Sequence, residues 1–194
     1  MYLYIHGFNS SPASIKARQL ANRLTTLGRA REFVCPALSH RPHDAMRQLE
    51  TLIVTDGPRA VLVGSSLGGF YATWLAEKHG CKAVLVNPAL TPHLGLEAYV
   101  GPQRNLYTNA PYELTAAHLA EMATYHVAAP SRMERYFVMV TTGDELLPYR
   151  DTLAKYPGAP HLVVEGSDHG FAEFERYLDA VIAFGDGAVA WPRL

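Results

Sequence analysis

Cysteine is scarce in this sequence, and neither sign of charge is in excess. The 194 residues contain 2 cysteines, Cys35 and Cys81, which are too few for a disulfide framework and lack the paired spacing of a zinc site. Lys and Arg number 17 against 18 Asp and Glu, so the formal net charge is −1. We therefore expect a reducing, cytoplasmic environment, no metal and no nucleic-acid partner.

Membrane, targeting and nucleotide-binding patterns are also absent. No apolar run approaches the roughly 20 residues that span a membrane, and the segment after Met1 lacks the basic and apolar regions of a signal peptide. There is no G-x-G-x-x-G fingerprint and no Walker loop, so we expect no nucleotide cofactor. With 48% hydrophobic and 18% charged residues, the composition is that of an ordinary globular protein, and the length favours one domain over residues 1–194.

Short apolar runs that predict strands alternate with helical patterns along most of the chain. The predicted strands cover residues 2–5, 32–35, 60–63, 83–86, 136–141 and 161–165. The first helix is expected to start at Ser11-Pro12, where serine would cap it and proline would take its first position. This alternation predicts an α/β fold with about six mostly parallel strands and helices on both faces of the sheet.

The sequence Gly64-Ser65-Ser66-Leu67-Gly68 follows an apolar strand and precedes a helical pattern. A G-x-S-x-G sequence in this context is typical of a nucleophile elbow, a tight turn that lifts a serine hydroxyl above the sheet. The absence of side chains at Gly64 and Gly68 allows strand and helix to pack closely around the turn. Ser66 is therefore the candidate nucleophile.

A serine hydroxyl needs a base, and in folds with this elbow the acid and the histidine follow the serine in that order. Asp144 and Glu145 come shortly after the predicted strand 136–141, and His169 comes shortly after the strand 161–165. These positions predict His169 as the general base and Asp144 as the acid that orients it. Glu145 remains the alternative acid, because it is adjacent to Asp144.

Acyl transfer passes through an oxyanion that needs backbone N–H donors. One donor is expected from Leu67, the residue after the nucleophile, and the other from Phe8, in the loop that follows the first strand. Asn9 in the same loop is a candidate pocket residue, with a solvated loop as the alternative. His6 is expected to brace this loop rather than to take protons.

The stretch from His93 to Pro130 interrupts the alternation of strands and helices. It follows the strand that ends at Val86, so it leaves the sheet on the same side as Ser66. We expect a cap insertion whose tyrosines form part of the pocket, because tyrosine combines a large apolar face with a polar tip. The alternative is a cap that merely covers apolar surface. The four tyrosines are Tyr99, Tyr107, Tyr112 and Tyr125.

These motifs resemble the α/β-hydrolase superfamily, and more closely the small bacterial YqiA-type esterases. The resemblance extends along nearly the whole chain and is carried by the blocks 3–12, 63–75, 86–89, 142–145 and the segment around 169–171. It implies a minimal α/β-hydrolase sheet that lacks the first two strands of the full fold. It also implies esterase activity on short acyl esters or on acyl-CoA thioesters. A sister branch of the family lacks the serine, whereas Ser66 is present in this sequence.

Together, the residues and the resemblance predict a serine esterase that hydrolyses short-chain carboxylic esters through an acyl-enzyme, without a cofactor. Its partner would be a small-molecule ester or thioester. Two alternatives stay open at this point. One is an acyl-CoA thioesterase that uses the same residues, and the other is a non-catalytic binding module on a hydrolase fold.

Overall fold

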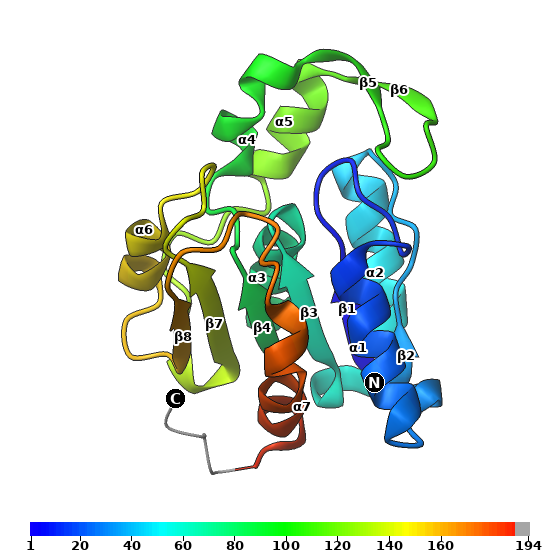
Figure 1. The fold of residues 1–194 in the computed structure, drawn as a ribbon. Coiled ribbons are helices and arrows are strands. Elements are labelled where there is room, and N and C mark those ends of the chain that lie inside the picture. Colours follow the sequence, from blue (N-terminus) through cyan, green and yellow to red (C-terminus); the bar gives the residue numbers. More distant parts are fainter. Residues whose placement is uncertain (189–194) are drawn as a thin grey trace.

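A computed structural model of the chain describes residues 1–188. Its centre is a six-stranded parallel sheet with the order β2-β1-β3-β4-β7-β8 (Figure 1). The strands are β1 Tyr2–Ile5, β2 Phe33–Val34, β3 Val61–Ser65, β4 Lys82–Val86, β7 Tyr136–Thr141 and β8 His161–Val164. The predicted fold class and the six predicted strands are therefore confirmed. Residues 189–194 of the predicted single domain lie outside the described residues.

The central strands are buried on both faces. Every residue of β1, β3 and β7 is buried, which explains why these segments are continuous apolar runs rather than alternating patterns. The edge strand β2 is shorter than the predicted 32–35, because it pairs with β1 only through Tyr2–Phe33 and Leu3–Val34. The sheet thus ends in a short edge next to the first helix.

Helices cover both faces of the sheet, as predicted. Buried side chains of α1 and α7 pack on one face, and those of α2 and α3 pack on the other, with α6 partly buried beside them (Figure 1). None of the helices within residues 1–188 is long and apolar enough to cross a bilayer. The bounds are α1 Ile15–Thr26, α2 Pro42–Asp56, α3 Leu67–His79, α6 Tyr149–Lys155 and α7 Leu178–Asp186, with 3-10 turns η1 Ala30–Glu32, η2 Gly57–Arg59, η3 Glu97–Tyr99, η4 Met133–Arg135 and η5 Phe174–Tyr177.

The first helix starts at Ile15 and not at Ser11-Pro12, so the predicted boundary is wrong. The Ser11 hydroxyl accepts a hydrogen bond from the Ala13 N–H at 3.0 Å, and the Ser14 N–H donates to Ser11 O at 3.1 Å. These bonds close a separate turn between the loop after β1 and the helix. Serine therefore stabilises a turn here instead of capping the helix.

The segment 93–130 lies over the carboxyl ends of the strands, at the top of Figure 1. It contains a helix over residues 116–123 as well as a two-stranded antiparallel hairpin that the sequence did not predict. The hairpin has no run of large apolar side chains, and Leu114 is its one fully buried strand residue. The elements are α4 Pro92–Gly95, β5 Gly101–Arg104, β6 Pro111–Leu114 and α5 Ala116–Ala123.

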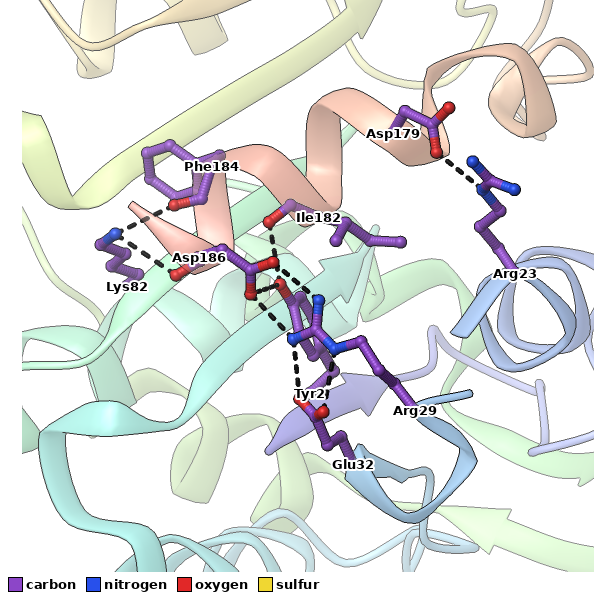
Figure 2. A network of polar contacts seen from close by, with 10 residues as sticks. Tyr2, Arg23, Arg29, Glu32, Lys82, Asp179, Ile182, Phe184 and Asp186 are labelled. Atoms are coloured by element: carbon purple, nitrogen blue, oxygen red, sulfur yellow. Dashed lines mark hydrogen bonds and ion pairs between the residues drawn. The ribbon is translucent and has the colours of Figure 1, made fainter. Parts of the chain in front are cut away.

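A network of polar contacts fastens α7 to the start of β1 (Figure 2). The buried Tyr2 hydroxyl donates to Ile182 O at 2.9 Å and to Asp186 Oδ1 at 2.8 Å. Arg29 donates to both oxygens of Asp186, at 2.7 and 2.8 Å, and to the carboxylate of Glu32. The Arg29 guanidinium outweighs partial burial and, with the Tyr2 hydroxyl, holds the pKa of Asp186 below its usual value.

We expect Asp186→Asn to lower the free energy of unfolding by about 0.5–1 kcal/mol at neutral pH, a figure reduced for the solvent screening of a carboxylate that is 43% exposed. Because the folded-state pKa of Asp186 is depressed, its contribution is present above the unfolded pKa of about 4 and is lost as pH falls through the folded pKa. Urea unfolding measured from neutral pH down to about pH 2 should show the difference from wild type closing.

The matched control is Asp179→Asn. Asp179 is 72% exposed and forms an ion pair with Arg23 at the surface, so its loss should leave stability nearly unchanged (Figure 2). If the difference for Asp186→Asn persisted in acid, the charge of Asp186 would not be its source.

Candidate active site

Ser66 occupies a strained turn between β3 and α3. Its φ of 54° and ψ of −118° lie where residues other than glycine are rarely found, a feature that clusters at functional sites. Backbone bonds hold the turn. The Ser66 N–H donates to Val86 O at 3.0 Å, and Ser66 O accepts from the N–H groups of Gly69 and Ala89 at 2.9 and 3.0 Å. The strained conformation is thus stabilised from β4, from the segment after it and from the first turn of α3.

The two glycines of the elbow allow the close contact between α3 and the sheet. A Cβ on Gly64 would lie 2.3 Å from Gly68 O, and a Cβ on Gly68 would lie 1.9 Å from Ile5 O. Both of these oxygens belong to the backbone, so no side-chain rotation relieves the clash. Only glycine fits at either position, and the amino end of α3 therefore rests against the carboxyl end of β1.

The structure brings Ser66, His169 and Asp144 together at the carboxyl edge of the sheet. Ser66 Oγ lies 3.0 Å from His169 Nε2, and His169 Nδ1 lies 2.8 Å from Asp144 Oδ2. The Asp144 side chain is 2% exposed and that of His169 is 18% exposed. With the imidazole proton on Nδ1 and directed to Asp144, Nε2 can accept the proton of the Ser66 hydroxyl.

Hydrogen bonds keep Asp144 ionised in spite of its burial. Burial by itself raises the pKa of this carboxyl, but the bond from His169 and those from two backbone N–H groups outweigh it and lower the pKa below its usual value. The backbone donors are Leu146 and Leu147, which lie 2.9 and 2.8 Å from Asp144 Oδ1. A carboxylate held in this way can orient His169 and stabilise an imidazolium.

Glu145, the alternative acid, contacts the backbone of His169 and not its ring. Glu145 Oε2 accepts the His169 N–H at 3.0 Å, and the Glu145 side chain is exposed. Over residues 1–188, Asp144 is the acid that bonds to this imidazole. The geometry therefore favours Asp144 as the orienting carboxylate and gives Glu145 a place in the histidine loop.

A buried asparagine that the sequence analysis missed, Asn87, holds the same loop. Its Nδ2 donates to Thr141 Oγ1 at 3.0 Å and to the carbonyl oxygens of Asp168 and His169, both at 3.2 Å. Its Oδ1 accepts the Thr141 N–H at 3.0 Å. Asn87 thereby joins the ends of β4 and β7 to the loop after β8. The available signal was a polar side chain directly after the apolar run 83–86.

The two candidate oxyanion donors lie on either side of Ser66. Leu67 follows it directly, and a Cβ on Gly7 would lie 3.9 Å from Ser66 Oγ, so the loop that contains Phe8 passes beside the hydroxyl. In the part of the chain that the structure describes, neither the Phe8 N–H nor the Leu67 N–H has a hydrogen-bond partner. Two such free N–H groups next to a serine hydroxyl can bind an oxyanion.

A cavity of about 540 Å³ opens beside these residues. It lies between the loop 6–13, the segment 37–40 and the β5–β6 hairpin, and Phe8, Asn9 and Leu67 are among its walls. Tyr71 and Met122 add apolar surface from α3 and α5. The cavity is large enough for a small organic group and adjoins both candidate oxyanion donors.

The cavity walls carry no formal charge. Among the described residues that line it there is no Asp, Glu, Lys or Arg. Its two histidines, His6 and His40, have pKa values lowered by burial, so they are neutral at pH 7. Nor does any group of three or more His, Cys, Asp or Glu within residues 1–188 have the arrangement of a metal site. The walls therefore suit an uncharged ligand group.

The structure separates the four tyrosines of the segment 93–130. Tyr112 lines the cavity, and the other three are not among its lining residues. Tyr125 packs instead on Trp74, with ring centroids 5.0 Å apart, and its hydroxyl lies 2.7 Å from His43 Nδ1. Tyr99 and Tyr107 are 49% and 47% exposed. Packing and exposure, which depend on tertiary contacts, thus keep these three tyrosines out of the cavity walls.

The fold defines the class of this protein. Est1E from Butyrivibrio proteoclasticus has a TM-score of 0.70 to this chain at 14% sequence identity, over 98% of this chain and 88% of that one. For alpha/beta hydrolase domain-containing protein 10 from mouse the TM-score is 0.69 at 16% identity, over 96% and 89%. For the monoacylglycerol lipase of Paleococcus ferrophilus it is 0.61 at 14% identity, over 94% and 94%. The chain therefore has the α/β-hydrolase fold.

Sequence comparison identifies the family of this chain within that fold. Residues 1–186 match the family described as "Uncharacterised protein family (UPF0227)", and the chain belongs to this family. A UPF0227 protein of Shewanella woodyi is 31% identical over 97 residues, which are 47% of this chain and 52% of that protein. UPF0227 protein Shewmr7_1806 of Shewanella sp. (strain MR-7) is 24% identical over 200 residues, covering 95% and 98%. The predicted YqiA-type family is confirmed, and the chain has the fold of the predicted superfamily.

Proposed function

We propose that this protein is a serine hydrolase that cleaves short-chain carboxylic esters through an acyl-enzyme. The observation that carries the proposal is the hydrogen-bonded series Ser66–His169–Asp144, with distances of 3.0 and 2.8 Å, on a strained elbow beside an uncharged cavity. The α/β-hydrolase fold, which this chain shares with a monoacylglycerol lipase, supports ester hydrolysis as the reaction class.

In the proposed mechanism, His169 Nε2 takes the hydroxyl proton as Ser66 Oγ attacks the acyl carbonyl. The imidazolium, stabilised by Asp144, gives the proton to the departing alcohol, and the acyl group stays on Ser66. Water then attacks the acyl-enzyme while His169 takes its proton. Return of that proton to Ser66 Oγ releases the acid and restores the starting state.

The N–H groups of Phe8 and Leu67 stabilise the negative charge on the carbonyl oxygen in both steps. Loss of one such donor in serine hydrolases costs about 10²–10³ in kcat. Because both donors are backbone groups, their positions depend on the loop around Phe8 and on the elbow, and not on side-chain rotamers. The geometry of these two segments therefore affects the rate directly.

The cavity indicates the substrate class. It is bounded by the two residues whose N–H groups would hold the carbonyl oxygen, so we assign it to the acyl chain. A carboxylate or phosphate in this cavity would lose hydration without a cationic side chain to replace it. The favoured substrates are therefore esters with an uncharged acyl group.

Covalent labelling with a fluorophosphonate tests the nucleophile. Wild-type protein should form an adduct at Ser66, and Ser66→Ala should form none and lose turnover of p-nitrophenyl acetate, because the hydroxyl that bonds to His169 is gone. Mass spectrometry of the adduct locates it. Ser65→Ala, which removes the buried neighbouring serine, is the control and should keep the label. If the folded wild-type protein were not labelled, the serine-hydrolase proposal would be contradicted and the non-catalytic binding module would be the remaining alternative.

Two neighbouring carboxylates can be compared directly. Asp144→Asn should lower kcat by about 10⁴-fold, because His169 loses the acceptor that holds its Nδ1 proton. Glu145→Gln is the matched control and should stay within about threefold of wild type, since Glu145 contacts only the His169 backbone in this loop. If Glu145→Gln lowered kcat strongly and Asp144→Asn left kcat nearly unchanged, the orienting role would belong to Glu145.

Substrate charge is tested with acyl groups of equal length. The kcat/KM for p-nitrophenyl butyrate should exceed that for p-nitrophenyl hemisuccinate by at least about tenfold, because the cavity has no cation for the second carboxylate. Equal values would contradict the assignment of the cavity to the acyl chain. The same butyryl group on matched oxygen and sulfur leaving groups decides between an esterase and a thioesterase.

A further inference from the structure

The β5–β6 hairpin is hydrogen-bonded to the loop that contains Phe8. Tyr112 OH donates to Asn9 Oδ1 at 2.5 Å, and Asn9 Nδ2 donates to Gln103 Oε1 at 3.2 Å. Gln103 and Tyr112 are paired opposite each other in the hairpin. The Asn9 side chain is therefore held by both strands at the same pair of residues.

Two more bonds connect the same segments. The Leu106 N–H donates to Asn9 O at 3.0 Å, and Asn105 Nδ2 donates to Ser10 O at 2.8 Å. Asn105 Oδ1 also accepts the Thr108 N–H at 3.0 Å, which orders the turn of the hairpin. The hairpin thus contacts side-chain and backbone groups of two consecutive residues, directly after Phe8.

The loop is anchored on both sides of Phe8. Asn9 has a φ of 54°, a left-handed conformation that asparagine tolerates better than most residues. Before Phe8, the Leu38 N–H donates to His6 Nε2 at 3.2 Å, so the ring proton lies on Nδ1 and donates to Gly7 O at 3.1 Å. His6 therefore connects the loop to Leu38 before Phe8, and the hairpin holds the loop after Phe8.

We infer that Tyr112 is a positioning residue of the oxyanion hole, which acts through Asn9 to hold the Phe8 N–H where the oxyanion develops. The inference rests on the proposed function, because it assigns Tyr112 to the transition state of that reaction. Burial raises the pKa of Tyr112 to about 12, so its hydroxyl remains protonated and continues to donate to Asn9 at neutral pH.

This role affects the transition state more than the bound ester. A displaced Phe8 N–H weakens the contact with the tetrahedral oxyanion, whereas binding of the planar ester changes little, so kcat falls and KM is retained. Tyr112 also lines the cavity. If it served only as a cavity wall, a change at this residue would alter the shape of the cavity and therefore KM, and kcat would be retained. Tyr112→Phe keeps the ring and removes only the hydroxyl, and it therefore separates the two roles.

The experiment measures esterase kinetics and inhibitor binding for Tyr112→Phe. We expect kcat for p-nitrophenyl butyrate to fall about tenfold and KM to stay within about twofold of wild type. The Ki of a trifluoromethyl ketone, which forms a tetrahedral adduct with the serine, should rise about tenfold, whereas the Ki of the matching methyl ketone should not change. Asn9→Gly keeps the left-handed backbone and should give the same loss, with no further loss in the double variant.

Tyr156→Phe is the matched control. It removes a buried tyrosine hydroxyl that lies 2.8 Å from Thr73 Oγ1, away from the loop of Phe8, and it should keep kcat even if its Tm falls as far as that of Tyr112→Phe. Unchanged kcat in folded Tyr112→Phe, or an equal rise in both Ki values, would overturn the inference. Fluorophosphonate labelling is done first. An unlabelled wild type contradicts the proposed function and this inference with it, whereas a labelled wild type with an unaltered Tyr112→Phe contradicts the inference alone.

Discussion

The contact between the amino end of α3 and the backbone of β1 is the constraint on which the site depends. With no side chains at Gly64 and Gly68, the helix begins against Ile5 O, and the chain between β3 and α3 must turn sharply through Ser66. The resulting φ of 54° is unfavourable for serine by itself. It persists because Val86 O accepts the Ser66 N–H and because three backbone N–H groups donate to Ser66 O. The same turn sets the position of the Leu67 N–H.

A parallel sheet brings the loops of the candidate site to one edge, because every strand ends at that edge. Parallel pairing alone does not align an imidazole between a serine and a carboxylate. Buried polar contacts do so here. Asn87 bonds to the loop of His169 and to Thr141, and backbone N–H groups hold one oxygen of Asp144 while the other meets the ring. Each partner is therefore oriented by groups that are themselves held by the sheet.

The segment 93–130 contacts the candidate site mainly through polar groups, although its four tyrosines suggest an aromatic contact. Four tyrosines predict an aromatic wall, yet most contacts between the hairpin and the loop of Phe8 involve amide side chains and backbone groups. The physical reason is that β5 and β6 have few apolar residues to bury, so polar groups of the hairpin find partners in the half-buried loop 8–10. Tyr112 takes part through its hydroxyl as much as through its ring.

The sequence by itself determined the fold class, the six strands and the elbow around Ser66. Continuous apolar runs separated by helical patterns require a covered parallel sheet, and a G-x-S-x-G turn depends only on its immediate neighbours. Only the tertiary structure decided which of the candidate side chains take part in the site, because local sequence patterns do not distinguish them. The sequence predicted Asp144 as the orienting acid and left the adjacent Glu145 as the alternative, and only the fold directs one carboxylate to the ring of His169 and the other to its backbone. The role of Asn87 and the selection of one tyrosine out of four also depend on contacts between residues far apart in the chain, which short-range patterns do not encode.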